Sequence, residues 1–305
     1  MSDVTPSWVA TAHQIAVRAW SWLDDAREHF ALPAGVSLDR LQPNDDVQPL
    51  GELAIAVSVA TCGGALGSLA TQTIPALAEH AWAQLRNGDL LYELACNHTI
   101  DTYPLETYAW FVRAGHRNSQ LDELLKHLSS LRAARVPEVL PNRALAVYNA
   151  ERLLGLPSRA DPVALTARTW LGGCPEPWRT DFFTLYMMTH TVFHLTDWGV
   201  RPDCLPAHLQ AYLHAWLPAW LEVYLEAGQW DLVGELLIVD LCLAESVHYP
   251  DAWDALARAQ QPDGLLPARP GRVPRDPATA FHDHYHPTIV AAIAGSLALS
   301  QRFAA

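Results

Sequence analysis

The spacing of apolar side chains predicts helices along almost the whole chain. Apolar residues recur every three or four positions, as on one face of a helix, and alternating β-branched runs are nearly absent. Prolines and glycines separate the periodic segments. The chain is therefore expected to be an all-α protein, with helices over residues 6–30, 50–64, 66–86, 89–97, 103–115, 119–133, 141–155, 161–170, 180–197, 206–227, 229–247, 250–260 and 287–303.

The links between these segments indicate how the helices are arranged. Most links are short, which favours antiparallel helical hairpins, and no fixed-length repeat is present, which favours a closed array over a regular solenoid. Residues 1–45 are predicted to form a flanking helix and linker, and residues 46–305 a single all-α domain. One long irregular link, Gln261–His282, holds five prolines and two glycines. A link of that size inside a compact domain is usually functional.

Charge and cysteine content narrow the class of protein. The formal net charge of −13 disfavours nucleic acid or an anionic membrane as partner, because phosphate binding needs concentrated positive charge. Lys126 is the only lysine, and so strong a preference for arginine is typical of a GC-rich bacterium. Five cysteines without a CxxC pair indicate reduced thiols. No signal peptide or membrane span is recognisable, so a cytoplasmic protein is expected.

The stretch MMTHTVFHLTDWG (187–199) is the first candidate for chemistry. On a helix, His190, His194 and Asp197 lie at roughly 0°, 40° and −20°, which places them on one narrow stripe. Two histidines four residues apart can reach one metal ion from a single helix, and a nearby carboxylate can bind the ion or orient a ring. The alternative interpretation is a buried polar network in which these histidines have a structural role.

The stretch GELLIVDLCLAES (234–246) is the second candidate. Asp240 lies in an otherwise apolar run, and a buried carboxylate must pair, bind a metal or stay protonated. Cys242 follows two residues later, but on a helix the two side chains point about 200° apart. A functional role is therefore expected for Asp240, whereas Cys242 fits an ordinary core position.

The stretch HDHYHPT (282–288) is the third candidate. Proline suits the first turn of a helix, so Pro287 predicts that His282–His286 forms the loop and the N-terminus of a final helix. The positive end of a helix lowers the proton affinity of a nearby histidine and favours the neutral form that binds metals. Asp283 and Tyr285, in the same run, can transfer protons or orient a ligand.

The C-terminal region resembles the corresponding part of protein prenyltransferase β-subunits. The residues that carry the resemblance are QQPDGLLPARPG (260–271) and DHYHPTIVAAIAGSLALSQ (283–301), which is similar to a run that opens a small-residue helix in that family. The wider superfamily of terpenoid cyclases and prenyltransferases has an α/α toroid fold, with two concentric rings of helices around a central cavity. The resemblance implies a toroid-like arrangement for residues 46–305.

The same resemblance implies a metal ligand. In prenyltransferase β-subunits the histidine of this run binds zinc, and the matching residue is His286. The other ligands in that family include an aspartate and a cysteine two residues apart, and the comparable pair is Asp240 and Cys242. Pro287 follows where the family has threonine, and the glycine-rich repeats of that family are missing, as is the DxDD-type stretch of class II terpene cyclases. The resemblance thus implies the fold and the metal histidine, not prenyl transfer or cyclisation.

These patterns together predict a metal-dependent enzyme with one site in a central cavity. The predicted ligands of zinc or ferrous iron are His190, His194, Asp240 and His286, and the predicted proton-transfer or orienting groups are Asp197, Asp283 and Tyr285. The stretch THTVFHLTDWG (189–199) also resembles a motif of an actinobacterial helical family found among natural-product genes. That resemblance implies a small or peptide-like substrate from bacterial secondary metabolism. Two alternatives stay open: a metal-free acid–base cyclase or isomerase, and a non-enzymatic helical binding protein.

Overall fold

The all-α class predicted from the sequence is confirmed. A computed structural model describes residues 7–33, 35, 38–42, 46–63, 66–98, 101–135, 139–158 and 160–304, and within these ranges it holds helices and no strand. The helices are α1 (Ser7–Asp25), α2 (Gln48–Gly63), α3 (Ile74–Gln84), α4 (Asp89–Asn97), α5 (Tyr103–Arg113), α6 (Ser119–Ser130), α7 (Pro141–Leu154), α8 (Pro162–Thr166), α9 (Phe182–Thr196), α10 (Ala207–Glu226), α11 (Trp230–Leu241), α12 (Pro250–Ala259) and α13 (Pro277–Ala304).

Short turns complete the described secondary structure. They are the 3₁₀ turns Arg27–Phe30, Leu38–Arg40, Arg86–Gly88, Ala133–Arg135, Pro177–Arg179 and Pro202–Cys204, and the π-helical turn Leu69–Thr73 that leads into α3. Across the described part of the chain, no helix combines the length and the apolar character that a membrane span requires.

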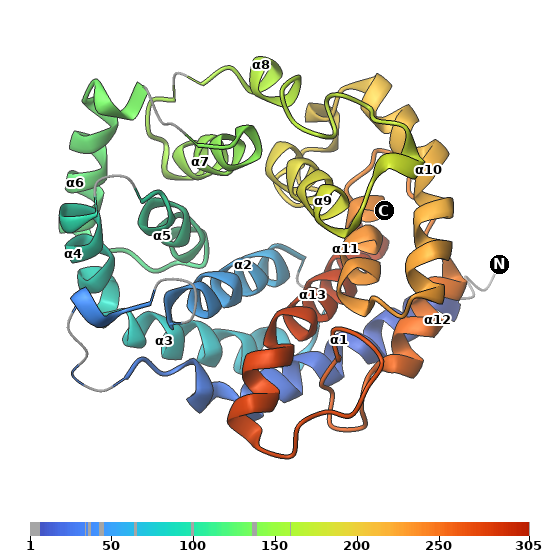
Figure 1. The fold of residues 1–305 in the computed structure, drawn as a ribbon. Helices are drawn as coiled ribbons and strands as arrows, with labels where there is room; N and C mark the ends of the chain where they lie inside the picture. The colour runs from blue at the N-terminus through green and yellow to red at the C-terminus, as the bar shows by residue number, and fades with distance from the viewer. Residues whose placement is uncertain are drawn as a thin grey trace.

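The helices α2, α5, α7, α9, α11 and α13 form a ring. Each packs against the next in this order, and α13 packs against α2, so the ring closes (Figure 1). The helices α1, α3, α4, α6, α8, α10 and α12 lie outside it (Figure 1). Two helices illustrate the effect of position, because a helix with neighbours on both sides can be apolar nearly all round. In α11 every residue from Leu232 to Leu241 is buried, whereas in the outer helix α6 only Leu121 and Leu125 are buried.

The N-terminal helix α1 packs closely against α13. Ala12, Ala16 and Ala19 are buried on the contact side of α1, and Gly295 of α13 faces them. A Cβ atom on Gly295 would lie 2.6 Å from the backbone oxygen of Ala12 and 2.7 Å from the Cβ of Ala16. Small residues on both helices therefore allow this close contact, and the helix in residues 1–45 shares the hydrophobic core of the rest of the chain.

We expect Gly295→Val to destabilise the protein by about 3 kcal/mol, because the added side chain meets backbone that cannot move without separating α1 from α13. Thermal unfolding followed by circular dichroism measures the effect. Gly173→Ala is the matched control, because Gly173 is exposed and its nearest neighbour would lie 3.5 Å from the new Cβ. Equal melting temperatures for the two variants would contradict the proposed contact.

The last helix begins ten residues earlier than the sequence predicted. Asp276 caps it, since its Oδ2 accepts hydrogen bonds from the backbone N of Thr279 at 2.9 Å and from the Thr279 hydroxyl at 2.7 Å. Pro277, not Pro287, occupies the first turn. Pro287 lies inside the helix, where it can donate no backbone hydrogen bond. The interpretation of His282–His286 as a loop is therefore wrong, and helical geometry points these side chains in different directions.

Candidate functional site

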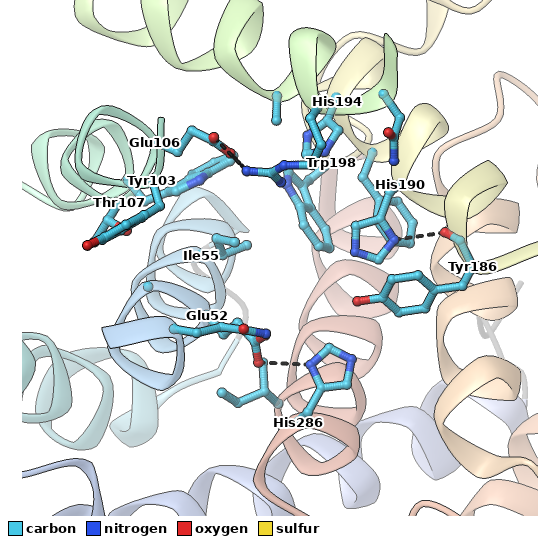
Figure 2. Close-up of a pocket in the computed structure, with 18 of the residues that line it drawn as sticks. Glu52, Ile55, Tyr103, Glu106, Thr107, Tyr186, His190, His194, Trp198 and His286 are labelled. Carbon is cyan, nitrogen blue, oxygen red and sulfur yellow. Dashed lines mark hydrogen bonds and ion pairs between the residues drawn. The ribbon is translucent and has the colours of Figure 1, made fainter. Parts of the chain in front are cut away.

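A cavity of about 610 Å³ lies within the helical ring (Figure 2). All six ring helices contribute to its wall, so segments from both halves of the chain line it. Hydrophobic and aromatic side chains make up much of the wall; they include Ile55, Trp110, Phe193, Trp198, Ile238, Ile289 and Ile293. Polar side chains interrupt it; they include Glu52, Asp101, Tyr103, Glu106, Asn142, Arg143, Tyr186, His190, His194, Glu235 and His286. A mostly apolar cavity of this size with a few polar groups is typical of a small-molecule site.

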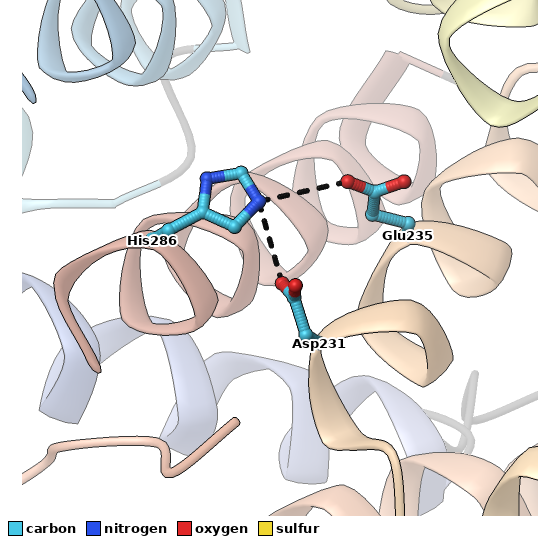
Figure 3. Close-up of side chains that lie close together, drawn as sticks. All are labelled: Asp231, Glu235 and His286. Carbon is cyan, nitrogen blue, oxygen red and sulfur yellow. Dashed lines mark ion pairs between the residues drawn. The ribbon is translucent and has the colours of Figure 1, made fainter. Parts of the chain in front are cut away.

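His286 of α13 lies at the centre of the most polar part of the wall. Its Nδ1 lies 2.8 Å from Oε2 of Glu52 on α2. Its Nε2 lies 3.4 Å from Oδ1 of Asp231 and 3.7 Å from Oε1 of Glu235, both on α11 (Figure 3). The two ring nitrogens thus face carboxylates from two different helices, one on each side of α13.

Asp231 and Glu235 reach His286 together because they lie four residues apart on α11, and therefore on one face. The contact between α11 and α13 is close at this level, since a Cβ on Gly234 would lie 2.7 Å from Cγ1 of Val290. One ligand atom from each of Asp231, Glu235 and His286 lies within 4.8 Å of the other two. These residues form the Asp231–Glu235–His286 cluster.

The charges of this cluster depend on one another. Burial by itself lowers the pKa of His286, but the negative charges of Glu52 and Asp231 raise it, and the net pKa is well above 6.5. Burial raises the pKa of Glu52, yet the charge of His286 and the hydrogen bonds from His286 and Gln48 bring it below 4.5. Burial, together with the charges of Glu235 and Glu52, raises the pKa of Asp231 to about 6, although His286 opposes this. Three carboxyl groups, those of Glu52, Asp231 and Glu235, thus surround the one imidazole of His286.

His190 of α9 stands beside the cluster. Its Nδ1 lies 2.9 Å from the backbone oxygen of Tyr186, so this nitrogen donates a hydrogen bond to that carbonyl group. The same Nδ1 lies 3.7 Å from Oε2 of Glu235, which also accepts a hydrogen bond from the Thr189 hydroxyl. Glu235 thus lies between His190 and His286. The Tyr186 ring packs on His190 at 4.1 Å between centroids, and its hydroxyl points into the cavity (Figure 2).

His194, one turn after His190, also lines the cavity. Its Nε2 is buried and has no hydrogen-bond partner among the described residues. Burial, with smaller contributions from the nearby His190 and Arg143, holds the pKa of His194 well below 6.5. His194 is therefore a neutral imidazole. The structure brings His190, His194 and His286 to one cavity, as the sequence analysis anticipated, but only His286 belongs to the cluster.

Asp197 has a structural role, which corrects its assignment to proton transfer. It ends α9 in a left-handed conformation with φ of 50°, and its carboxylate lies 2.8 Å from Arg113 and 2.6 Å from Arg152. Asn149 also contacts it, at 3.3 Å. These ion pairs tie the end of α9 to α5 and α7, and Asp197 does not line the cavity.

Asp240 also lies away from the cavity, and its assignment as a metal ligand is corrected. The helix α11 ends at Leu241, and the carboxylate of Asp240 accepts hydrogen bonds from the backbone N of Val247 at 2.9 Å and of His248 at 2.8 Å. Those bonds satisfy the buried charge that made Asp240 conspicuous in the sequence. Cys242 is fully buried, and burial raises the pKa of its thiol to about 12, as expected for a core residue.

Asp283 and Tyr285 do not reach the cavity either. Because residues 282–286 are helical, His282 and Asp283 point to the exposed side of α13, where they contact each other at 3.2 Å. The Tyr285 ring stacks on Phe281 at 5.3 Å between centroids and meets Phe30 edge-on. Of the residues in this run, only His286 lines the cavity, so the predicted roles of Asp283 and Tyr285 in its chemistry are also corrected.

Glu52, Asp231 and Glu235 were not predicted as site residues from the sequence. A usable signal was present for Glu235, which interrupts the same apolar run as Asp240 and lies four residues after Asp231. Glu52 likewise interrupts the apolar run LGELAIAVSVA. Burial of a carboxylate in such a run indicates a partner but not which one, so the sequence could not separate these three from Asp240.

The fold and this site define a helical protein whose closed ring of helices surrounds an acidic, histidine-bearing cavity. The chain belongs to the family described as Domain of unknown function (DUF6895), which it matches over residues 16–296. No curated protein and no solved structure matches the chain.

Proposed function

We propose that the Asp231–Glu235–His286 cluster binds a divalent cation and that the cavity is the active site of a metal-dependent enzyme. The observation that carries the proposal is a pair of buried atoms, Nε2 of His286 and Oδ1 of Asp231, which face each other without a hydrogen bond. Buried polar atoms usually have a partner, and a shared cation would satisfy both. A site with one imidazole and two carboxylates suits zinc or ferrous iron.

The surroundings of His286 support this assignment. A metal-binding histidine usually donates its second N–H to a carboxylate, which fixes the ring and leaves the other nitrogen for the metal. Glu52 accepts that hydrogen bond from Nδ1 of His286, and Nε2 faces the two carboxylates of α11. The Thr189 hydroxyl donates a hydrogen bond to the second oxygen of Glu235 and so orients that carboxylate. Ligand atoms about 2.0–2.2 Å from one ion lie roughly 3–3.5 Å apart, close to the observed 3.4 and 3.7 Å.

The cavity supplies groups for a reaction beside such an ion. A divalent cation with open positions polarises a carbonyl group or lowers the pKa of a bound water molecule. The Nε2 of His190 can accept a proton, because its Nδ1 is committed to the Tyr186 carbonyl. The apolar wall excludes water from the rest of the substrate. These features favour a small or peptide-like, mostly apolar substrate, and the resemblance of residues 189–199 supports a place in secondary metabolism.

Titration of untagged protein with Zn²⁺ or Fe²⁺ tests the proposal, and we expect one ion per chain. We also expect the affinity to fall as the pH is lowered from about 8 through 6, because protons compete for the ligands. The pKa of Asp231 is raised to about 6 and that of His286 well above 6.5, so both groups take up protons over this range. Calorimetric titration at several pH values measures the trend. A pH-independent affinity would place the ion elsewhere.

A metal-free acid–base enzyme is the second candidate. One observation favours it: the pKa of His286 lies well above 6.5 despite burial, because Glu52 and Asp231 surround it, so His286 is a cation when no metal is bound. A protonated His286 as the acid and Nε2 of His190 as the base would then form an acid–base pair across Glu235. A folded protein that binds neither Zn²⁺ nor Fe²⁺ in the titration would favour this candidate.

A further inference from the structure

A second polar region of the cavity lies across from the metal cluster. It consists of Tyr103 on α5, Asn142 and Arg143 on α7 and His194 on α9. We call these four residues the Asn142 wall. Figure 2 shows Tyr103 and Glu106 on the other side of the cavity from His286, with Ile55 of α2 between them. The proposed metal chemistry uses none of these residues, so their polar atoms need another explanation.

Asn142 is the strongest indication of a ligand in this region. Its side chain lines the cavity and is only 5% exposed, yet its Oδ1 has no hydrogen-bond partner among the described residues. Its Nδ2 donates to the sulfur of Met187 at 3.2 Å, its one hydrogen bond within the residues that the structure describes, and thioether sulfur is a weak acceptor. A buried amide oxygen without a partner costs stability, so the arrangement favours a bound group that donates a hydrogen bond to it.

Two further polar atoms of the wall are buried and have no hydrogen-bond partner in the described part of the chain, the hydroxyl of Tyr103 and Nε2 of His194. The hydroxyl can donate or accept, and the neutral His194 ring can do either, depending on its tautomer. The Asn142 wall therefore offers both donors and acceptors to one ligand group.

Arg143 adds fixed donors. Its NH2 nitrogen bonds both oxygens of Glu106, at 2.6 and 2.7 Å, and Glu106 is held in turn by the Thr102 hydroxyl at 2.7 Å. The guanidinium group has five N–H donors, and these bonds use at most the two on one nitrogen. The hydrogens on Nε and NH1 can therefore bind a ligand oxygen while the ion pair stays intact.

We infer that the Asn142 wall recognises a neutral carboxamide or peptide-type amide group of an otherwise apolar substrate. The amide N–H donates to Oδ1 of Asn142, and the amide oxygen accepts from Arg143 or the Tyr103 hydroxyl. A carboxylate has no N–H for Asn142, and it would also face Glu106 and Asp101, which line the same side of the cavity. An ammonium group would face Arg143. A neutral amide fits the donors and acceptors without either conflict.

The inference deepens the proposed function and rests on it for the reacting group. The apolar side chains between the two polar regions hold the body of the substrate, and the group that reacts lies at the Asp231–Glu235–His286 cluster. The substrate class is thus a small apolar molecule that carries one amide away from its reacting group, as a short apolar peptide does.

Three probes with the same apolar body test the inference: 4-methylpentanamide, the slightly larger ester methyl 4-methylpentanoate, and the anion 4-methylpentanoate. Binding to the untagged full chain is measured by ligand-observed NMR. We expect the amide to bind roughly five- to tenfold tighter than the ester, as the loss of one or two hydrogen bonds implies. Equal binding of amide and ester, stronger binding of the anion, or no binding of any probe would overturn the inference.

Variants assign the preference to the wall. Asn142→Leu, of similar shape, is expected to remove the preference for the amide, and Tyr103→Phe, which removes a single hydroxyl group, provides a milder second variant if Asn142→Leu does not fold. Asp231→Asn is expected to lose the metal and keep the amide preference. Metal binding without an amide preference would refute this inference alone, and an amide preference without metal binding would refute the proposed function alone. An unchanged preference in both wall variants would place amide recognition elsewhere.

Discussion

Asp231→Asn is expected to weaken the binding of Zn²⁺ by roughly 100-fold or more, since even the loss of a residue that only supports a ligand costs 10- to 100-fold. The substitution keeps the size of the side chain and removes the negative charge that lies 3.4 Å from Nε2 of His286. Titration with Zn²⁺ against a competing chelator measures the affinity, and circular dichroism shows that the fold is retained. We expect Glu235→Gln to weaken Zn²⁺ binding in the same way, because it also removes a negative charge. Its local structure is kept, since the amide oxygen still accepts the hydrogen bond of Thr189.

Asp283→Asn and His282→Ala are the matched controls for these two variants. Both control residues lie on α13 within one turn of His286, and both are exposed. We expect both to bind Zn²⁺ as the wild type does. Wild-type affinity in Asp231→Asn would remove Asp231 from the ligand set, and a loss in Asp283→Asn would move the site to the protein surface. Comparing the cavity variants with the control variants thus shows whether the metal ion binds in the cavity or at the exposed residues of the histidine run.

Asp197→Asn is expected to destabilise the protein by about 3 kcal/mol and leave Zn²⁺ binding unchanged. The variant leaves the charges of Arg113 and Arg152 without the buried carboxylate that contacts both, and breaking a buried ion pair costs about 3–5 kcal/mol. Chemical denaturation measures the free energy of unfolding, and the metal titration measures the site.

An exposed ion pair provides the control for Asp197→Asn. Glu93 pairs with Arg86 at the surface, and surface pairs contribute about 0–1 kcal/mol. We therefore expect Glu93→Gln to unfold at nearly the wild-type denaturant concentration. A stable Asp197→Asn protein that has lost metal binding or activity would restore the functional role that the sequence pattern had suggested for this aspartate.

The histidines show how much of the site can be predicted from the spacing of residues along the chain. The four-residue interval between His190 and His194 predicted a shared helical face, and both line the cavity. The same argument placed Asp197 with them, but the helix ends there, and a left-handed residue turns its carboxylate toward Arg113 and Arg152. Spacing is informative only where the helix continues, and the position of a helix end depends on capping contacts that the pattern alone does not give.

The two prolines of the C-terminal region show a similar limit. Pro277 and Pro287 both fit the first turn of a helix, and the sequence rule alone cannot choose between them. The choice is made by Asp276, which caps the helix at Pro277 through two hydrogen bonds to Thr279. As a result, His286 faces the cavity as a helical residue, while Asp283 faces solvent.

The sequence by itself determined that the chain is all-α, where most helices lie, and that His190, His194 and His286 are candidates for one site, because helical periodicity and residue spacing are local properties. Only the tertiary structure decided which carboxylates meet His286. Glu52 lies 234 residues before it in the chain and reaches it because α13 packs against α2 and closes the ring. Asp231 and Glu235, rather than Asp240, face it because of how α11 is rotated against α13. The closure of a ring and the rotation of a helix depend on packing between distant segments, which a local pattern of residues does not contain.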